Sequence, residues 1–213
     1  MVYITNGDAF NEHFQKKNGV VAIPFREAMM DGDVPDVPIF SDAFIRARAS
    51  HHGVTQEYYR MHMQDMLSLK ETLKEEPALS LHFGCDTFCQ MNLLTLLAYL
   101  EELGYTGKVS LTLIDDETFS TIEEGIPVPL GIYRAIFHTL LVVRRTTPIL
   151  GVIRGDAIRH FWDYHNDDGF LAHTVREHSD EDEEDLLFRL INISAEYGLS
   201  EEMARRLIKK YKE

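Results

Sequence analysis

The chain is poor in cysteine, in basic residues and in long apolar runs. Only two of its 213 residues are cysteines, Cys85 and Cys89, so a fold held together by several disulfides is excluded. The longest apolar stretches, around residues 93–100 and 135–143, are too short or too interrupted to span a bilayer. The first ten residues lack the basic and apolar regions of a secretion signal. We therefore expect a cytoplasmic protein with no membrane contact.

Acidic residues outnumber basic ones, 35 to 21, which gives a formal net charge of −14. A negative field of this kind repels phosphate backbones and anionic lipid, so nucleic acid and membrane surfaces are poor partners. The sequence has no G-x-S-x-G motif, no P-loop, no complete dinucleotide fingerprint and no HExxH-type metal motif. Because these motifs are absent, the sequence gives no motif evidence for a particular cofactor or for a metal centre.

The first half of the chain alternates between two kinds of periodic segment. Strands are expected at residues 2–5, 20–23, 78–83 and 109–114, and helices at residues 9–17, 41–50, 55–73 and 88–103. Such alternation is typical of a parallel sheet with crossover helices. We predict an α/β fold with a Rossmann-like, mostly parallel sheet and flanking helices.

The pattern is weaker beyond residue 114, where proline and glycine bound a loop and residues 132–143 favour a helix. Two apolar stripes at helical spacing follow near the C-terminus, over residues 187–194 and 204–211, with Gly198 between them. They predict a helical hairpin. The expected organisation is a Rossmann-like domain over residues 1–125 and a mainly helical C-terminal region over residues 126–213.

Polar residues directly follow three of the predicted strands: Asn6, Gly7 and Asp8 after the first, Arg26 and Glu27 after the second, and Asp86 and Gln90 after the third. The carboxyl ends of parallel strands share one edge of a sheet, which is where open α/β sheets bind ligands. Recognition of a small anionic or phosphate-bearing ligand is therefore the expected function, and turnover of that ligand is left open.

Four of these residues have a use in holding such a ligand. Asn6 and Gly7 would position it, because glycine lets the backbone approach closely and the following helix offers free N–H groups. Arg26 would grip a carboxylate or phosphate through two parallel hydrogen bonds. Gln90 would orient the ligand by its amide.

The carboxylates of Asp8, Glu27 and Asp86 would act as acid or base, or hold a Mg²⁺-type ion through oxygen ligands. A purely structural interpretation accounts for the same residues. Asp8 and Asp86 each precede a predicted helix, where an aspartate N-cap contributes roughly 1 kcal/mol. Arg26 and Glu27 can pair with each other on the surface for about 0.5 kcal/mol.

Three stretches, ITNGD (4–8), FREAMMDG (25–32) and HFGCDTFCQMNLL (82–94), resemble the bacterial domain-of-unknown-function family 1835. The family pattern is a strand ending in Asn-Gly-Asp, an aromatic-Arg-Glu-Ala segment, an Arg-Ala pair and an Asp-x-Phe-Cys-Gln block. The motifs occur in matching order over roughly residues 2–115. The matching positions are Asn6, Gly7, Asp8, Arg26, Glu27, Gly32, Asp86, Cys89 and Gln90. The resemblance implies a fold and a site location, but no reaction.

The Arg-Ala pair of the family matches either of two consecutive pairs here, Arg46-Ala47 or Arg48-Ala49, so Arg46 and Arg48 are both ligand-binding candidates. The chain also departs from the family pattern. The family often carries a tryptophan and an acidic residue where this chain has His82 and Gly84, and its Gly-Pro dipeptide is interrupted after Gly32. A role that depends on that acid would be missing from this position.

The alternative is a non-catalytic interaction or regulatory module. The acidic residues of segment 156–185, or the basic residues of the last helix, would then bind a partner protein. The terminal hairpin also has helix-turn-helix proportions, and the basic residues of its last helix could meet DNA phosphates. They are Arg205, Arg206, Lys209, Lys210 and Lys212. The negative charge of the whole chain opposes that reading, and the sequence leaves open whether the protein is an enzyme.

Overall fold

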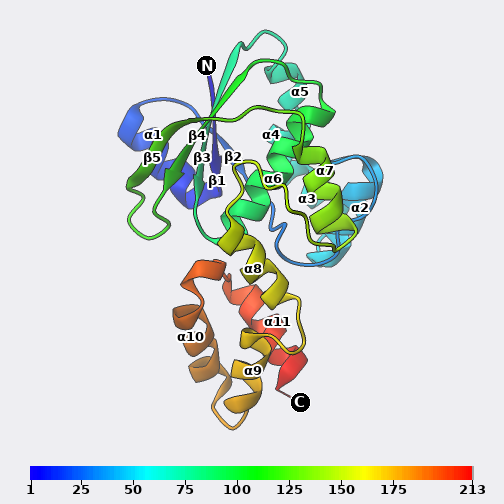
Figure 1. Cartoon of the computed structure of the whole chain (residues 1–213), viewed down its shortest axis with the longest axis vertical. Coiled ribbons are helices and arrows are strands. Elements are labelled where there is room, and N and C mark those ends of the chain that lie inside the picture. The colour runs from blue at the N-terminus through cyan, green and yellow to red at the C-terminus, as the bar shows by residue number, and fades with distance from the viewer. Residues whose placement is uncertain (213) are drawn as a thin grey trace.

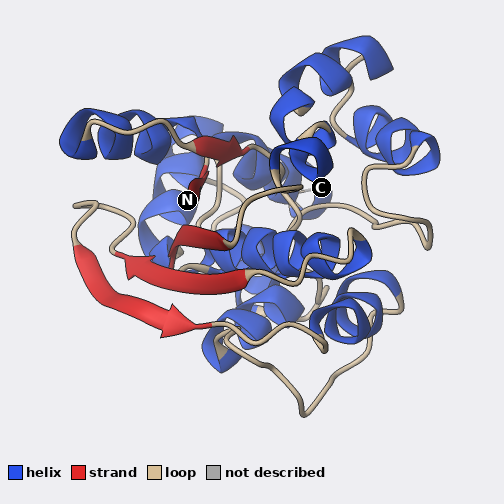
Figure 2. Cartoon of the chain, turned by 90° about the horizontal axis from the view of Figure 1, so that it is seen from above, coloured by secondary structure: helices blue, strands red, loops and turns tan. Residues whose placement is uncertain are grey.

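The β-branched and aromatic segments of the first half form one sheet. Its strands are β1 (Val2–Asn6), β2 (Ile23–Phe25), β3 (Ala78–Gly84), β4 (Lys108–Ile114) and β5 (Thr121–Pro127). They lie in the order β2-β1-β3-β4-β5, with the first four parallel and β5 antiparallel to β4. The computed structural model describes residues 1–212, and its helices surround the sheet (Figure 1, Figure 2). The predicted α/β class with a mostly parallel, Rossmann-like sheet is confirmed.

Helices fill the connections between the strands and the C-terminal part of the chain. Those around the sheet are α1 (Asp8–Asn18), α2 (Asp42–His51), α3 (Gln56–His62), α4 (Gln64–Leu67), α5 (Leu69–Thr72), α6 (Thr87–Glu102), α7 (Tyr133–Phe137) and the π-helix η1 (His138–Val142). The C-terminal ones are α8 (Gly155–Tyr164), α9 (Phe170–Glu177), α10 (Glu183–Ile193), the 3₁₀ helix η2 (Ala195–Tyr197) and α11 (Glu201–Tyr211).

One long helix was expected over residues 55–73, and the chain instead forms three short helices, α3 to α5. It leaves α-helical geometry at Met63 and at Ser68. These bends let Tyr59, Met66 and Leu69 all reach the same core, where each is buried. Tertiary packing here overrides the continuous helical pattern of the sequence.

The second strand begins three residues later than the apolar run that predicted it. Residues 20–22 precede β2, and Pro24 lies inside the strand, opposite Thr5 of β1. Proline is tolerated there because β2 is an edge strand, which has a free side that needs no ladder hydrogen bond. The strand therefore ends at Phe25, and Arg26 follows it directly.

The strand β5 could not be predicted from the sequence, because it lacks an apolar pattern. Most of its residues are exposed, and it contains two glutamates, Glu123 and Glu124, followed by Gly125. Charged residues on an edge strand prevent it from pairing with strands of other chains, and for the same reason the strand shows no clear apolar pattern. The strand crosses residue 125, where the Rossmann-like domain was expected to end. The α/β part continues beyond it, because α7 packs against α6.

Side chains alternate between the two faces of the sheet. On β1, Ile4 faces the larger core under α6, whereas Tyr3 faces α1 and packs with Phe10 and Phe14. The helix α6 is buried almost all round, as its apolar sequence predicts. The sheet is therefore a layer between α1 on one side and α6 on the other.

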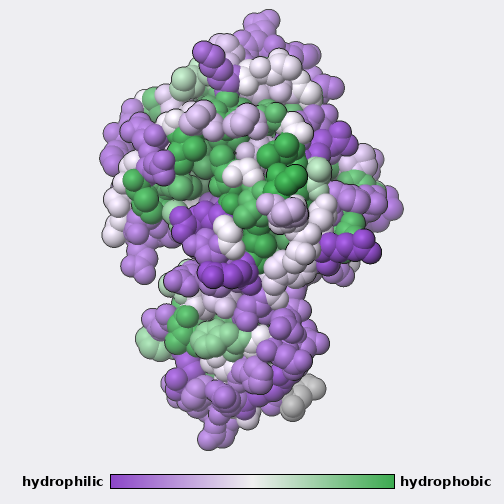
Figure 3. Space-filling model, in the orientation of Figure 1, coloured by the Kyte–Doolittle hydropathy of each residue, from purple (hydrophilic) through white to green (hydrophobic). Residues whose placement is uncertain are grey.

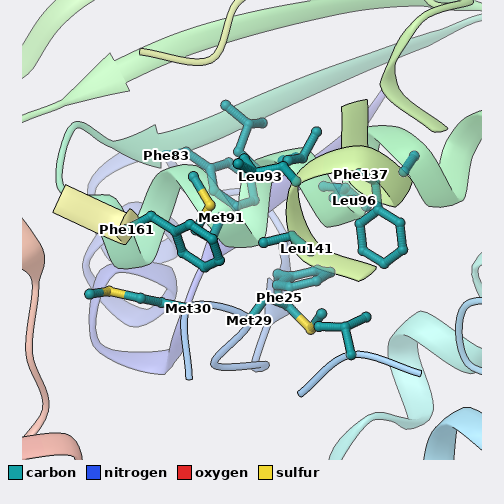
Figure 4. Close-up of a cluster of buried hydrophobic side chains, with 14 of the residues drawn as sticks. Phe25, Met29, Met30, Phe83, Met91, Leu93, Leu96, Phe137, Leu141 and Phe161 are labelled. Atoms are coloured by element: carbon teal, nitrogen blue, oxygen red, sulfur yellow. The ribbon is translucent and has the colours of Figure 1, made fainter. Parts of the chain in front are cut away.

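The larger core also holds the C-terminal helices. Figure 4 shows Met91 and Leu96 of α6 with Phe25 from the end of β2, Phe137 of α7 and Phe161 of α8. Because Phe161 belongs to the first C-terminal helix, one core joins the sheet to the helices that follow it.

The C-terminal helices α8 to α11 lie beyond the carboxyl ends of the strands (Figure 1). The predicted hairpin is formed by α10 and α11, and Gly198 between them adopts a left-handed conformation with φ of 67°. Within residues 1–212, no helix combines the length and the apolar character needed to cross a bilayer.

Candidate functional site

A cleft of about 310 Å³ lies between the carboxyl ends of β3 and β4 and the C-terminal helices. Its charged and titratable lining, apart from Cys85, is Asp86, Asp115, Asp116 and Glu117 on the strand side, and Arg154, Asp156, Arg159, His160 and Glu196 on the helix side. Strongly hydrophilic residues gather at the junction between the two parts of the molecule (Figure 3). The cleft lies beyond the carboxyl ends of parallel strands, which is the edge where open α/β sheets bind ligands, although its lining residues come from β3 and β4 and not from the β1–β3 pair at which the strand order reverses.

Two aspartates from neighbouring strands meet in the cleft. Parallel pairing of β3 and β4 sets Gly84 opposite Ile114, so Asp86 and Asp116, each two residues further on, emerge side by side. One oxygen of each carboxylate and the Sγ atom of Cys89 all lie within 4.8 Å of one another. We call Asp86 and Asp116 the aspartate pair. Carboxylates so arranged are suited to sharing a proton or holding a divalent cation.

The surroundings of the two carboxylates differ. Burial, and then the charge of Asp116, raise the pKa of Asp86 to about 7, and hydrogen bonds from the backbone and the side chain of Cys89 oppose this rise. Asp116 accepts hydrogen bonds from the backbone N–H groups of Cys85 and Asp86, at 3.0 and 3.2 Å, and from the Cys89 thiol at 3.3 Å. The fold therefore favours the protonated form of Asp86, whereas the oxygens of Asp116 are occupied by three hydrogen-bond donors.

The cysteines support the aspartate pair and do not act as nucleophiles. Burial, reinforced by the negative charge of the aspartate pair, holds the pKa of Cys89 well above its usual value, so its thiol stays protonated and donates to Asp116. Burial likewise raises the pKa of Cys85. Both cysteines are free. For this reason the two carboxylates, rather than a thiolate, are the groups able to bind a cation.

Two glycines make room for the aspartate pair because they carry no side chain. A Cβ atom on Gly84 would overlap the Asp116 carboxylate, and one on Gly198 would lie 2.5 Å from the Cγ atom of Asp86. Gly84 ends β3, whereas Gly198 belongs to the turn before α11. The aspartate pair is therefore enclosed by the sheet on one side and by the C-terminal hairpin on the other.

Asn6 lies beneath the aspartate pair as a supporting side chain. Its amide N–H donates to the Sγ atom of Cys89 at 2.9 Å, and its oxygen accepts from Asn92 at 2.9 Å. Gln90 is fully buried, donates to the carbonyl of Gly84 at 2.7 Å and accepts from the backbone N–H of Arg154 at 3.1 Å. Both amides were expected to contact a ligand. Their hydrogen bonds are instead used to hold strand ends and helices together.

Asp8 and Arg26 form a separate group outside the cleft. Gly7 is the N-cap of α1 and Asp8 its first helical residue, so Asp8 is not the expected cap. Arg26 donates to Asp8 at 2.8 Å, to Asp65 at 3.2 Å and to the carbonyl of His62 at 3.1 Å. Arg26 is therefore already paired with two carboxylates and does not line the cleft, and the surface pair that it was expected to form with Glu27 is absent because Glu27 pairs with Arg48.

Glu27 is buried below the surface, with an exposed fraction of 2%. Arg48 binds it through two hydrogen bonds of 2.9 Å, and the Tyr59 hydroxyl donates to it at 2.7 Å. Burial would raise the pKa of Glu27, but the charge of Arg48 and hydrogen bonds from His52 and Arg48 hold it below its usual range. Glu27 and Arg48 thus form an internal ion pair, and the exposed Arg46 is not part of the cleft lining.

Of the residues selected from the sequence, only Asp86 lines the cleft, while Asn6 and Gln90 support it from behind. Gly7 donates its N–H to the carbonyl of Phe25 and so extends the sheet. Asp116 was missed, although it directly follows the fourth predicted strand, and the rule that selects Asp86 selects it too. Arg159 comes from a helix whose position beside the strand ends has no signal in the sequence.

The helix side of the cleft carries one arginine whose charge is available. Arg154 is paired with Asp156 at 2.6 Å, and His160 lies 3.4 Å from Glu196. Arg159 is exposed and makes no ion pair within residues 1–212. The cleft therefore presents a carboxylate pair on one wall and an unused guanidinium on the other.

Comparisons of the chain with models of protein families, with curated proteins and with solved structures found no match. The resemblance to the domain-of-unknown-function family 1835 accordingly stays a prediction from the motifs. The chemistry of the cleft is the ground on which a function can be proposed.

Proposed function

We propose that the chain binds a small phosphate-bearing ligand together with a divalent cation in the cleft. The observation that carries this proposal is the aspartate pair on one wall, opposite Arg159 on the other. A Mg²⁺-type ion is commonly held by one or two carboxylates and by the phosphate oxygens of its ligand. An arginine binds the remaining phosphate oxygens through its planar, forked donors.

The charge of the cleft explains why a cation would be needed. Arg154 is paired with Asp156, which leaves Arg159 as the free arginine among the lining residues. The other carboxylates that line the cleft are those of Asp86, Asp115, Asp116, Glu117 and Glu196. A phosphate entering alone would meet a surplus of negative charge, whereas a bridging cation neutralises both sides. Cation binding would displace the proton of Asp86, so affinity should rise as the pH passes above about 7.

Turnover is a second step that such a site could support. With its pKa raised to about 7, Asp86 has the proton affinity of a general acid or base at neutral pH. Asp116, whose oxygens accept three hydrogen bonds, would stabilise positive charge beside it. Two carboxylates in different surroundings often divide these roles.

The family resemblance supports this placement of the site. Asp86 and Gln90 belong to the Asp-x-Phe-Cys-Gln block, and both lie at the cleft or directly behind it. The family often has an acid where this chain has Gly84, and here the Asp116 carboxylate fills the space beside Gly84. We propose that Asp116 supplies that acid from the next strand. A bacterial, cytoplasmic protein belongs to the same proposal, supported by the two free cysteines.

The test is a thermal-shift screen of the full chain with pyrophosphate, nucleotides and sugar phosphates, each with and without MgCl₂. We expect a shift with at least one phosphate only when Mg²⁺ is present, since a ligand at 100 times its Kd adds about 2.7 kcal/mol. Calorimetry with that phosphate should show losses of about tenfold or more for Asp116→Asn and for Arg159→Ala.

Arg46→Ala is the matched control, because Arg46 is equally exposed and does not line the cleft. Its affinity should equal that of the wild type. Binding that is unchanged by EDTA, or that Arg159→Ala leaves intact, would contradict the proposal, as would a wild-type chain that responds to none of these phosphates.

The second candidate function is a protein-interaction module, which one observation favours. Phe188 and Ile191 lie one turn apart on α10, and the exposed fraction of Phe188 is 72%. This alternative becomes the better one if no phosphate binds. The DNA-binding reading loses support, because Arg205, Arg206 and Lys210 of α11 are already paired with acidic side chains of the same chain.

A further inference from the structure

A groove of about 330 Å³ lies between the segment 36–39, which follows β2, and the helices α7 and η1. Glu102, the last residue of α6, also lines it, and α7 packs beside α6 (Figure 1). The groove shares no lining residue with the cleft. Its volume falls within the range of sites that hold small molecules. We call it the α7 groove.

Much of the lining of the α7 groove is apolar. Val37, Ile39, Phe137 and Val142 supply aliphatic and aromatic carbon from both walls. Ile39 and Phe137 also belong to the main core, with exposed fractions of 5% and 6%, so packing holds their positions. A branched or aromatic side chain that entered the groove would be removed from water, which is favourable.

Both walls of the α7 groove depart from regular backbone geometry. Phe40, which directly follows the first wall, has a φ of 59°, in the left-handed region that bulky residues avoid. Its ring packs edge-on against Tyr99, which holds it in place. On the other wall η1 is a π-helix, a wide turn that carries His138 and Val142. Irregular geometry of both kinds is concentrated at functional sites.

The rim of the α7 groove carries charges of both signs. The side chain of Arg134 is exposed and makes no ion pair or hydrogen bond within residues 1–212. Glu102 accepts from the backbone N–H of Ile39 through its Oε2 atom at 3.3 Å, and in the same range its Oε1 atom has no partner. Asp36 lies 3.4 Å from the Nε2 atom of His138, which is one helical turn beyond Arg134. A free guanidinium and two carboxylates therefore line the same small groove.

We propose that the α7 groove binds a free α-amino acid with an apolar side chain, at a site separate from the cleft. The guanidinium of Arg134 binds the α-carboxylate through two parallel hydrogen bonds. The carboxylates of Glu102 and Asp36 accept from the α-ammonium group, which is a donor only. The apolar side chain of the ligand fills the space beside Val37, Phe137 and the other apolar lining residues.

Ligands with a single charge fit this rim less well. A phosphate or a simple carboxylate would pair with Arg134 but would also meet the negative charges of Glu102 and Asp36. A simple amine would pair with those carboxylates and leave the guanidinium without a counter-charge. An α-amino acid carries one charge of each sign and so leaves neither side unpaired. Preference for the amino acid over both kinds of analogue is therefore the property that identifies the site.

Calorimetric titration of the full chain, without phosphate or Mg²⁺, tests the α7 groove separately from the cleft. The probes are L-leucine and L-phenylalanine. Isocaproate and phenylpropionate are their analogues without the amine, and isoamylamine and phenylethylamine are those without the carboxylate. We expect saturable binding of at least one amino acid, and binding about tenfold weaker or less for both of its analogues. Failure of both amino acids to bind, or an analogue that binds as tightly as its amino acid, would overturn the proposal.

Two variants assign the binding to the groove. Arg134→Gln should weaken it by about tenfold or more, because the guanidinium is lost, and Val37→Trp should abolish it by filling the apolar space.

Arg145→Gln is the matched control, because Arg145 is also exposed, makes no ion pair within residues 1–212 and does not line the groove. Its affinity should equal that of the wild type, and thermal unfolding checks that each variant is folded. Unchanged binding in folded Arg134→Gln or Val37→Trp would refute the assignment, as would an equal loss in Arg145→Gln. Whether a phosphate binds the cleft has no bearing on these outcomes.

Discussion

Glu27 and Arg48 have the sequence pattern of a ligand-binding site, but in the structure they form a buried ion pair that holds parts of the fold together. Glutamate directly after a strand and arginine on the next helix are the residue types of a ligand site. Here both side chains are buried and pair with each other, and Tyr59 and His52 provide further hydrogen-bond partners for Glu27. Such a pair is costly to desolvate, and it is most damaging when only one partner is removed.

Arg48→Met should therefore lower the free energy of unfolding by about 3–5 kcal/mol, because it leaves the Glu27 carboxylate buried without its counter-charge. The double variant Glu27→Gln with Arg48→Met should recover much of that loss. Urea unfolding of both variants measures the difference. Arg46→Met, two residues away and exposed, should stay within about 0.5 kcal/mol of the wild type.

At the scale of the element, α6 depends on a cap that is also part of the cleft. Asp86 is the N-cap of α6 and accepts from the N–H of Cys89 at 2.6 Å. Its pKa is raised from 3.8 to about 7 by burial and by Asp116. Between these values the folded chain keeps a proton that the unfolded chain has lost, so this group makes stability fall as the pH rises from about 4 to 7.

Asp86→Asn should remove this pH dependence while keeping the cap, since asparagine is an equally good N-cap. At pH 8 the variant should be more stable than the wild type by about 1–2 kcal/mol, because the repulsion with Asp116 is gone. At pH 5 the two should be nearly equal. Thermal or urea unfolding across this range checks the expectation.

The matched control is Asp182→Asn, which changes the exposed N-cap aspartate of α10. It should show no stabilisation at pH 8 relative to pH 5. A gain that is the same at both pH values for Asp86→Asn would mean that the carboxylate is not held in its neutral form by the fold.

The elements that the sequence predicted well are those whose pattern is set by burial. The first, third and fourth strands and α6 are apolar because both faces of the sheet are covered. The elements that could not be predicted from the sequence are determined by factors other than burial. β5 is exposed and charged as an edge strand, and the bends at Met63 and Ser68 follow the shape of the core, which no local pattern records.

The same division holds for the candidate site. Residues at strand ends could be located from topology alone, and Asp116 needed only the same rule applied to a fourth strand. Whether a polar side chain points into a cleft or into a buried pair depends on distant partners. Nothing near Glu27 in the sequence indicates Arg48, and nothing near Asp86 indicates Gly198.

At the scale of the whole molecule, one continuous core connects the sheet with the C-terminal helices, since Leu81 of β3, Phe161 of α8 and Leu207 of α11 belong to the same buried cluster. We expect a single cooperative unfolding transition. The one tryptophan, Trp162, lies in α8 and reports on the helical part, while circular dichroism reports on the whole chain. The two urea curves should coincide.

Phe161→Ala should destabilise both signals together, by about 3–5 kcal/mol, as for the loss of a fully buried phenylalanine. Phe188→Ala is the control, because that phenylalanine is exposed on α10 and its loss should be small. Two separate transitions, with the tryptophan signal lost first, would show that the helices fold independently of the sheet.

The turn at Gly198 sets an order of events during synthesis. Every strand and both members of the aspartate pair emerge from the ribosome before that turn does, so the proposed cleft stays open to water until α11 has been made. A product cut short upstream of the turn would lack the side chains that α11 adds to the shared core, Leu207 among them, and would be destabilised throughout. It would also lack the turn that closes over Asp86.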